Sequence, residues 1–204
     1  MYIFLIVLGI ILILLGIFGM LTSKSRQSSP STPSTQAPQT TVSPDTTLTN
    51  EEKGKAFEDF IVSRFAPSDY TLVEKVNDYT SRHHNTERSK YADMVFRKKD
   101  SGIEFAVECK YRSAWSGKDD DKTISWVDQR KIDDYNYFSK EREIDFVVIF
   151  GVGGTPSKPD EVYALPLRLL QKPLPQRYIF LQKFRIKDPY SNYTFDESHH
   201  SLTL

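Results

Sequence analysis

Three charged residues near the middle of the chain have types and spacing that could hydrolyse a phosphodiester bond. Asp93 lies in a segment whose composition predicts a β-strand, Tyr91–Lys98, and Glu108 and Lys110 lie in the next such segment, Ile103–Tyr111. Two carboxylates that face each other repel, and a divalent cation such as Mg²⁺ converts this repulsion into coordination. A bound cation lowers the pKa of a water ligand, and an ammonium group nearby can orient that water and stabilise developing negative charge.

The residues between these two segments set the register of the expected hairpin. If Lys99 lies opposite Gly102, apolar side chains face apolar side chains and opposite charges face each other. The pairs on one face are then Phe96/Phe105, Met94/Val107 and Ala92/Cys109, and those on the other are Arg97/Glu104, Val95/Ala106, Asp93/Glu108 and Tyr91/Lys110. We therefore expect Asp93 and Glu108 to face each other at about 5 Å between Cβ atoms, with Lys110 on the same face. In the alternative interpretation these residues lie on a solvated sheet face, which antiparallel sheets commonly have.

The elements around the hairpin predict the order α-β-β-β-α-β. Asn50 is expected to cap the first helix, and Pro67 to follow its end. An apolar stripe on this helix consists of Phe57, Phe60, Ile61 and Phe65. The other expected elements are a strand over Thr71–Val76, loops over Asp78–Lys90 and Ser113–Lys122, a helix over Ser125–Lys140 and a strand over Ile144–Val152. The tail is expected to add strands over Glu161–Leu165 and Tyr178–Ile186 around a short helix over Leu167–Gln171.

This arrangement resembles the PD-(D/E)XK nuclease superfamily, which includes restriction endonucleases and DNA-repair nucleases. Tyr91-Ala92-Asp93 resembles the first half of the motif, with alanine in place of its proline, and Glu108-Cys109-Lys110 matches the second half. The resemblance covers residues 50–152. It implies an α/β fold with a restriction-endonuclease-like αβββαβ core, in which a mixed central sheet is flanked by helices. A motif of this kind has weight only in its structural context.

The resemblance also implies roles for particular residues. Asp93 and Glu108 would hold Mg²⁺ or Mn²⁺, assisted by Glu58 from the first helix, and Lys110 would orient or activate water. For Glu58, an ordinary exposed helix glutamate is an equally good interpretation.

Three further residues are implied to bind the substrate. Gln129 resembles a glutamine that contacts substrate in some branches of the superfamily, and Tyr135 would accompany it, although the spacing differs from the usual Q-x-x-x-Y. Arg97 belongs to a locally basic stretch that could supply phosphate contacts. Nucleic acid, with DNA favoured, is the implied partner.

The N-terminal residues predict a membrane anchor. Ile3–Leu21 contains only apolar residues and glycine, and a helix of this length spans about 28 Å, close to the thickness of the bilayer core. We assign a single transmembrane helix to residues 1–22, and a cleaved signal peptide is the alternative. Lys24 and Arg26 follow the apolar run, which predicts a single-pass protein whose C-terminal domain is cytoplasmic.

Composition divides the rest of the chain and excludes some classes of protein. Residues 23–49 are rich in Ser, Thr and Pro and predict a disordered linker, or alternatively an extracellular stalk. Residues 50–204 form the expected domain, with a core over 50–152 and a C-terminal extension over 153–204. The 204-residue chain has 27 basic and 27 acidic residues, which excludes a histone-like nucleic-acid binder. Its single cysteine, Cys109, excludes a disulfide framework and is expected to be a buried thiol.

Two other functions remain open at this stage. One is a catalytically inactive domain of the same fold that binds nucleic acid or a protein partner at the membrane. The other is a ligand-binding domain exposed on the cell surface at the end of a stalk. Oligomeric state, the choice between DNA and RNA, and the choice between endo- and exonuclease action do not follow from the sequence.

Overall fold

The first helix begins at a cap one residue earlier than the sequence predicted. The structure is a computed structural model that describes residues 48–76 and 91–203. Helix α2 (Asn50–Val62) follows Thr49, whose hydroxyl accepts a hydrogen bond from the Glu52 N–H, while the Glu52 carboxylate accepts one from the Thr49 N–H. Asn50 is therefore the first helical residue and not the cap, because the threonine can form this reciprocal pair. The predicted apolar stripe is buried, at Phe57, Phe60, Ile61 and the following Phe65.

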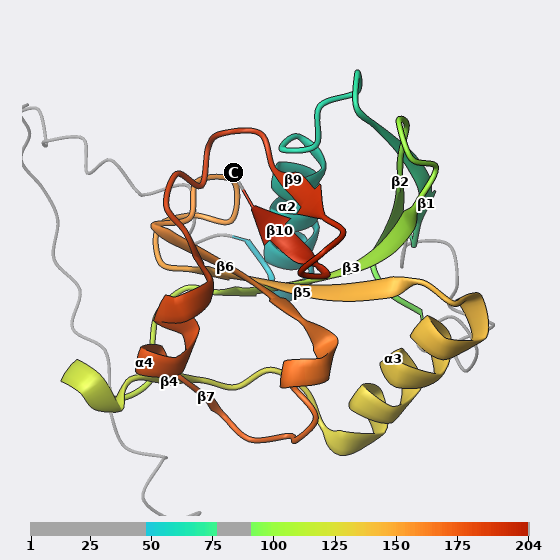
Figure 1. Cartoon of the computed structure of the whole chain (residues 1–204). Coiled ribbons are helices and arrows are strands. Elements are labelled where there is room, and N and C mark those ends of the chain that lie inside the picture. Colours follow the sequence, from blue (N-terminus) through green and yellow to red (C-terminus); the bar gives the residue numbers. More distant parts are fainter. Residues whose placement is uncertain (1–47, 77–90, 204) are drawn as a thin grey trace, which may run out of the picture. The chain divides into compact units, whose positions relative to one another are not determined.

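A six-stranded mixed sheet forms the centre of the domain, in the order β1-β2-β3-β5-β6-β8 (Figure 1). Strands β3 and β5 are parallel, and the other neighbouring pairs are antiparallel. The strands are β1 (Tyr70–Lys75), β2 (Met94–Lys98), β3 (Glu104–Arg112), β5 (Asp145–Val152), β6 (Glu161–Pro166) and β8 (Arg185–Ile186). The expected α/β class with a mixed central sheet is confirmed.

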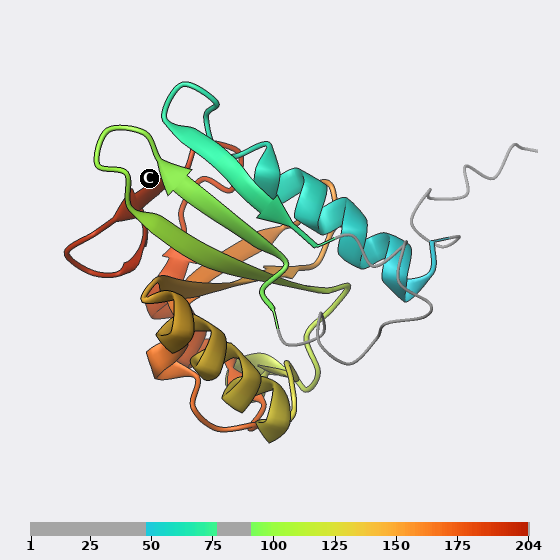
Figure 2. The ribbon, with the colours of Figure 1, turned by 90° about the vertical axis from the view of Figure 1, so that its right-hand side faces the viewer.

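Helices cover both faces of this sheet (Figures 1 and 2). Helix α2 packs on one face through Phe57, and helix α3 (Gln129–Arg142) packs on the other through Ile132, Tyr135 and Phe138. A Cβ atom built on Gly151 of β5 would lie 2.3 Å from the Phe57 ring, so glycine is needed where α2 approaches the sheet. Alternate residues of β3 therefore enter two separate apolar cores, and neither face is solvated as the alternative interpretation required.

The hairpin register is confirmed where backbone pairing exists. Strands β2 and β3 pair as Met94/Val107, Val95/Ala106, Phe96/Phe105 and Arg97/Glu104. Pairing ends at Met94, three residues later in the chain than the predicted start of the strand. Ala92 lies in the core on the α3 side and Cys109 in the core on the α2 side, so the predicted pair Ala92/Cys109 is wrong. The regular alternation of side chains stops where the chain enters β2.

The C-terminal residues differ most from the expectation. The predicted strand over Tyr178–Ile186 is instead helix α4 (Tyr178–Leu181), the 3₁₀ turn η7 (Gln182–Phe184) and the short strand β8. Aromatic and branched residues predicted a strand, but the helical turn buries Leu181 in the core on the α3 side, and tertiary packing overrides local preference. Helix α3 also starts later than expected, because Asp128 caps it by accepting a hydrogen bond from the Lys131 N–H.

Short elements complete the domain. The other 3₁₀ turns are η5 (Asp119–Asp121) and η6 (Leu167–Leu169), and the remaining strands are β4 (Thr123–Ile124), β7 (Gln176–Arg177), β9 (Thr194–Asp196) and β10 (Ser201–Thr203). Strand β4 pairs with β7, and β9 with β10. The β9–β10 hairpin contributes Phe195 and Leu202 to the core on the α2 side.

The predicted transmembrane helix at residues 1–22 lies outside the described residues, as do nearly all of the predicted linker and all of the loop predicted over Asp78–Lys90. In residues 48–76 and 91–203, no helix combines the length and the apolar character needed to cross a membrane.

Candidate active site

Asp93 lies at the point where strand β2 begins and holds the neighbouring strand through its side chain. Its Oδ2 accepts a hydrogen bond from the backbone N–H of Cys109 at 2.7 Å, and its own carbonyl accepts one from the Val76 N–H at 2.9 Å. Burial raises the pKa of Asp93 well above its usual value, and the charge of Glu108 raises it further, whereas Lys110 opposes both. The side chain is therefore a desolvated carboxyl group within the electrostatic field of both other motif residues.

Glu108 is the most unusual residue of the site, because its side chain is only 3% exposed. Its Oε1 accepts a hydrogen bond from the Tyr135 hydroxyl at 2.6 Å, and the same oxygen forms an ion pair with the Lys110 ammonium. Its Oε2 is buried and has no hydrogen-bond partner among the described residues. A buried carboxylate oxygen without a partner is costly, so an unpaired oxygen of this kind calls for an explanation.

The Lys110 side chain lies between the buried carboxylates and the surface. Burial alone would lower the pKa of this lysine, but the charges of Glu108 and Asp93 outweigh it, and the pKa is raised. The group is therefore an ammonium ion at neutral pH. Its side chain remains 22% exposed and lines a cavity, so the cation is accessible from one side.

The cavity has a volume of about 520 Å³ and lies between the first turns of α2 and the end of β3. Glu58 lines it from α2, and its charge contributes to the raised pKa of Asp93, so the two carboxylates lie close together. The full set of lining residues is Asn50, Glu51, Lys53, Gly54, Glu58, Asp93, Cys109, Lys110, Tyr111, Arg112 and Ser113.

The donor set of the site suits a cation that keeps water ligands. Within residues 48–76 and 91–203, no group of three or more His, Cys, Asp or Glu side chains is arranged to hold a metal ion alone. Mg²⁺ is typically bound by one or two carboxylates, together with waters and substrate phosphate oxygens. The unpartnered oxygen of Glu108 and the neighbouring carboxylate of Asp93 fit this pattern.

Two of the residues predicted to bind substrate lie elsewhere. Arg97 is four positions farther along β2 than Asp93, which corresponds to about 13 Å at the rise of a strand. Its guanidinium pairs with Glu104 at the surface. Gln129 lies in the first turn of α3, where its side-chain amide donates to Asp133 at 2.9 Å. The structure therefore brings neither side chain to the cavity.

Tyr135 is near the site but not where the sequence placed it. Its side chain is fully buried, at 0% exposure, and its hydroxyl contacts Glu108 from the α3 side of the sheet. A side chain with no exposed surface cannot contact a substrate in this structure, so the expected substrate contact is replaced by a contact to the carboxylate.

The sequence interpretation also missed part of the cavity wall. Glu51 and Gly54 lie seven and four positions before Glu58, and helical periodicity places all three on one face of α2. Arg112 lies two positions after Lys110 on β3, and its guanidinium donates to the Ser125 carbonyl at 3.1 Å. Both periodicities are visible in the sequence once Glu58 and Lys110 are chosen as reference points.

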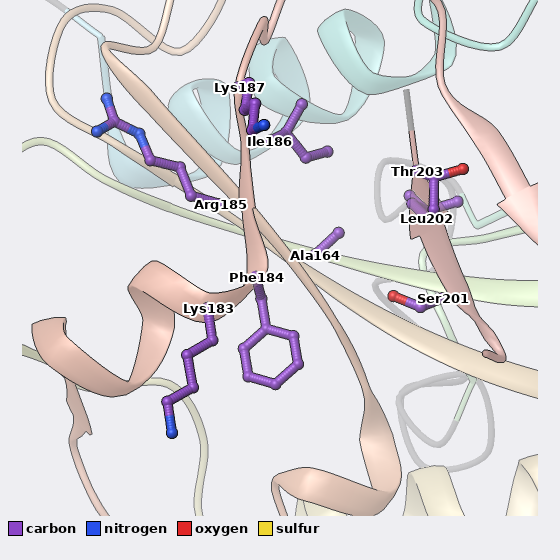
Figure 3. A pocket seen from close by; sticks show the side chains of 9 residues that line it. All are labelled: Ala164, Lys183, Phe184, Arg185, Ile186, Lys187, Ser201, Leu202 and Thr203. Carbon is purple, nitrogen blue, oxygen red and sulfur yellow. The ribbon is translucent and has the colours of Figure 1, made fainter.

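A separate hollow of about 370 Å³ lies between β8 and β10 (Figure 3). It is lined by Ala164, Lys183, Phe184, Arg185, Ile186, Lys187, Ser201, Leu202 and Thr203. None of the described site residues that the sequence predicted lines this hollow. They line the cavity beside α2, pack beneath it or lie on the surface.

Comparisons with known proteins give limited information. No family model matches the chain, and no curated protein sequence matches it. Among solved structures, the chain is similar to Archaeoglobus fulgidus Hjc, a Holliday junction resolvase from an archaeal hyperthermophile. The sequences are 10% identical, the match covers 64% of this chain and 93% of the resolvase chain, and the TM-score is 0.45.

Proposed function

We propose that the domain is a divalent-metal-dependent nuclease of the restriction-endonuclease-like fold, which hydrolyses phosphodiester bonds of DNA. The observation that carries the proposal is the state of Glu108. This carboxylate is buried beside the Lys110 ammonium, one of its oxygens has no partner in the described part of the chain, and Asp93 lies in its electrostatic field. Such an arrangement is costly for folding and is typical of a functional site.

Asp93 and Glu108 are the proposed ligands of Mg²⁺ or Mn²⁺, with Glu58 in a supporting position. When bound, the cation would lower the pKa of a water ligand and polarise a phosphate oxygen. The cation would then compensate the negative charge of both carboxylates, which accounts for their burial close to each other. Asp93 is fixed by the Cys109 N–H and Glu108 by the Tyr135 hydroxyl, so these two groups are held in place before a substrate arrives.

Lys110 is the proposed group that acts on the substrate. Its ammonium is held by Glu108 and remains accessible from the cavity. In that position it can hold the attacking water by a hydrogen bond and stabilise the charge that develops on the phosphate. Its raised pKa means that it acts as a cation and hydrogen-bond donor, and not as a general base at neutral pH.

Nucleic acid is supported as the substrate by the basic residues Lys53, Lys110 and Arg112, which line the cavity and can contact phosphate groups. The acidic residues Glu51, Glu58 and Asp93 line it too, and a divalent cation would offset their charge. DNA is the class that we propose, and cleavage of RNA alone would correct that choice.

Incubation of the purified full-length chain with supercoiled plasmid DNA tests the proposal, in Mg²⁺ and in EDTA. We expect nicking or linearisation in Mg²⁺, none in EDTA, and none with Asp93→Asn or Glu108→Gln. Asp100→Asn is the matched control, because this carboxylate lies in the exposed turn at the other end of β2. Binding of DNA without cleavage by the wild type would favour a catalytically inactive binding domain.

We also propose that residues 1–22 anchor this nuclease in the membrane as a single-pass helix, with the domain on the cytoplasmic side and residues 23–49 as its linker. The support is the apolar run from Ile3 to Leu21 and the basic residues Lys24 and Arg26 that follow it.

A further inference from the structure

The tyrosine on α3 that contacts Glu108 is placed to orient this carboxylate. Its hydroxyl donates to Oε1 at 2.6 Å, and it leaves Oε2 without a partner among the described residues. We propose that Tyr135 is a positioning residue that fixes the rotation of the Glu108 carboxylate, so that Oε2 stays available to the divalent cation. This inference rests on the proposed nuclease function, because it concerns the metal that would bind there.

The tyrosine ring is held rigidly enough to define a direction. It is fully buried, its centroid lies 5.0 Å from that of Phe146 on β5, and the Lys131 ammonium lies 5.3 Å from its centroid. Ile132 and Phe138 of the same helix are buried beside it. The packing of α3 on the sheet therefore fixes the position of the hydroxyl oxygen, which has a single proton to donate.

Lys110 cannot supply the same orientation. Its ammonium has three equivalent donors on a flexible stem, and the terminal torsion of a glutamate side chain is broad and roughly two-fold. An ion pair alone would therefore let the carboxylate plane rotate about the Cγ–Cδ bond. The phenol restricts this rotation because it holds one carboxylate oxygen from inside the core. The Tyr135 hydroxyl carries one proton and donates it to the Glu108 carboxylate, which can only accept.

Metal binding by two phenylalanine variants tests the inference without relying on cleavage. Tyr135→Phe removes the hydroxyl that contacts Glu108. Tyr163→Phe is the matched control, because Tyr163 is also fully buried in the core on the α3 side, but its hydroxyl accepts a hydrogen bond from Gln182 at 2.7 Å. We would titrate the full-length proteins in detergent micelles with Mn²⁺ by isothermal titration calorimetry, after circular dichroism has shown that they are folded.

Loss of a group that orients a metal ligand typically weakens metal binding by about 10–100-fold. We expect this increase in the Mn²⁺ dissociation constant for Tyr135→Phe and no change for Tyr163→Phe. The Mg²⁺ concentration that gives half-maximal cleavage should rise by the same factor, and saturating Mg²⁺ should largely restore the rate. A merely structural role would lower the melting temperature and leave the dissociation constant unchanged.

The possible results separate this inference from the proposed function. If the wild type binds Mn²⁺ and folded Tyr135→Phe binds it equally well, Tyr135 is not a positioning residue and the nuclease proposal is unaffected. If the wild type neither binds Mn²⁺ nor cleaves DNA, the proposed function is wrong and this inference is wrong with it. Should Tyr135→Phe not fold, 4-methylphenylalanine at position 135 would fill the volume of the hydroxyl without donating, and wild-type affinity in that protein would overturn the inference.

Discussion

The carboxylate of Asp93 accepts a hydrogen bond from the backbone N–H of Cys109 at 2.7 Å, in the middle of the Glu108-Cys109-Lys110 sequence. The side chain thus continues the contact between β2 and β3 beyond Met94, where backbone pairing ends. One hydrogen bond thereby fixes the first half of the motif against the second half, and it also holds two carboxylates close together in a desolvated place. This arrangement has consequences for stability that can be measured without substrate.

Replacing Asp93 by asparagine should stabilise the metal-free protein at neutral pH. The amide can still accept the hydrogen bond from Cys109, but it carries no charge that burial and Glu108 would penalise. Relief of about 1 kcal/mol corresponds to a rise in melting temperature of about 2–4 °C for a domain of this size. Differential scanning fluorimetry in EDTA at about pH 8 measures the rise.

The sign of the pH dependence provides the control. Because the pKa of Asp93 is raised in the folded state, its ionisation destabilises that state, and the penalty is absent below the unfolded pKa of about 3.9. The penalty grows as the pH rises above that value and is complete above the folded pKa. The gain from Asp93→Asn should therefore disappear at about pH 3. Asp120→Asn, at an exposed position in η5, should show no such gain, and a gain that persists at low pH would contradict the electrostatic explanation.

Lys110→Met should abolish cleavage and also destabilise the protein. Removal of the ammonium leaves the Glu108 carboxylate buried with only the Tyr135 hydroxyl, and loss of one partner of a buried pair costs about 3–5 kcal/mol. The double variant Glu108→Gln/Lys110→Met should recover most of that stability and remain inactive. Urea unfolding and plasmid cleavage measure the two effects separately. Wild-type cleavage by Lys110→Met would remove the role proposed for this lysine.

Gly151→Ala should destabilise the domain through the contact between α2 and the sheet. The new methyl group would lie 2.3 Å from the Phe57 ring, and overpacking of this kind costs about 1–3 kcal/mol. Gly54→Ala is the opposite case, because within residues 48–76 and 91–203 no atom beyond its chain neighbours and its own helix backbone lies within 4 Å of its built Cβ atom, and the change should stabilise α2 by up to about 1 kcal/mol. Denaturant unfolding of both variants measures the two effects. If Gly151→Ala is as stable as the wild type, the Phe57 ring moves away from the new methyl group at no cost.

The sequence predicted the strand pairing because both strands carry residues whose fit depends on register. Phe96 lies opposite Phe105 and Arg97 opposite Glu104, as expected, since a shift by one residue would expose the whole apolar set. The irregular entry into β2 could not be predicted in this way. The Asp93 side chain accepts the hydrogen bond of the Cys109 N–H in place of a backbone carbonyl. The alternation of apolar residues does not predict that a side chain takes over this role.

The environment of Glu108 also lay beyond the sequence. Ile132, Tyr135 and Phe138 recur at helical spacing and are buried, but this periodicity does not predict that the Tyr135 hydroxyl reaches a residue 27 positions earlier in the chain. That contact depends on how α3 crosses the sheet. Helix α3 lies between the parallel strands β3 and β5 in the chain and packs on this face of the sheet, so Glu108 lies in a core and not on the solvated face that an isolated hairpin would present.

The membrane anchor remains a prediction that a separate experiment can decide. An apolar helix over residues 1–22 would hold the full-length chain in the membrane fraction, and Lys24 and Arg26 would keep its C-terminal end in the cytoplasm. Residues 23–49, as a flexible chain, would have a root-mean-square span of about 27 Å, which lets the domain reach nucleic acid near the membrane. Deletion of residues 1–22 should release a folded and active protein into the soluble fraction.

Cell fractionation and protection from external protease test both parts of this prediction. The full-length chain should sediment with membranes, resist extraction by carbonate, and be cut by protease only after the cells are opened. A soluble chain that lacks its first residues would show a cleaved signal peptide instead. Digestion of the domain in intact cells would place it outside, where genomic DNA is absent and the extracellular stalk becomes the better interpretation of residues 23–49.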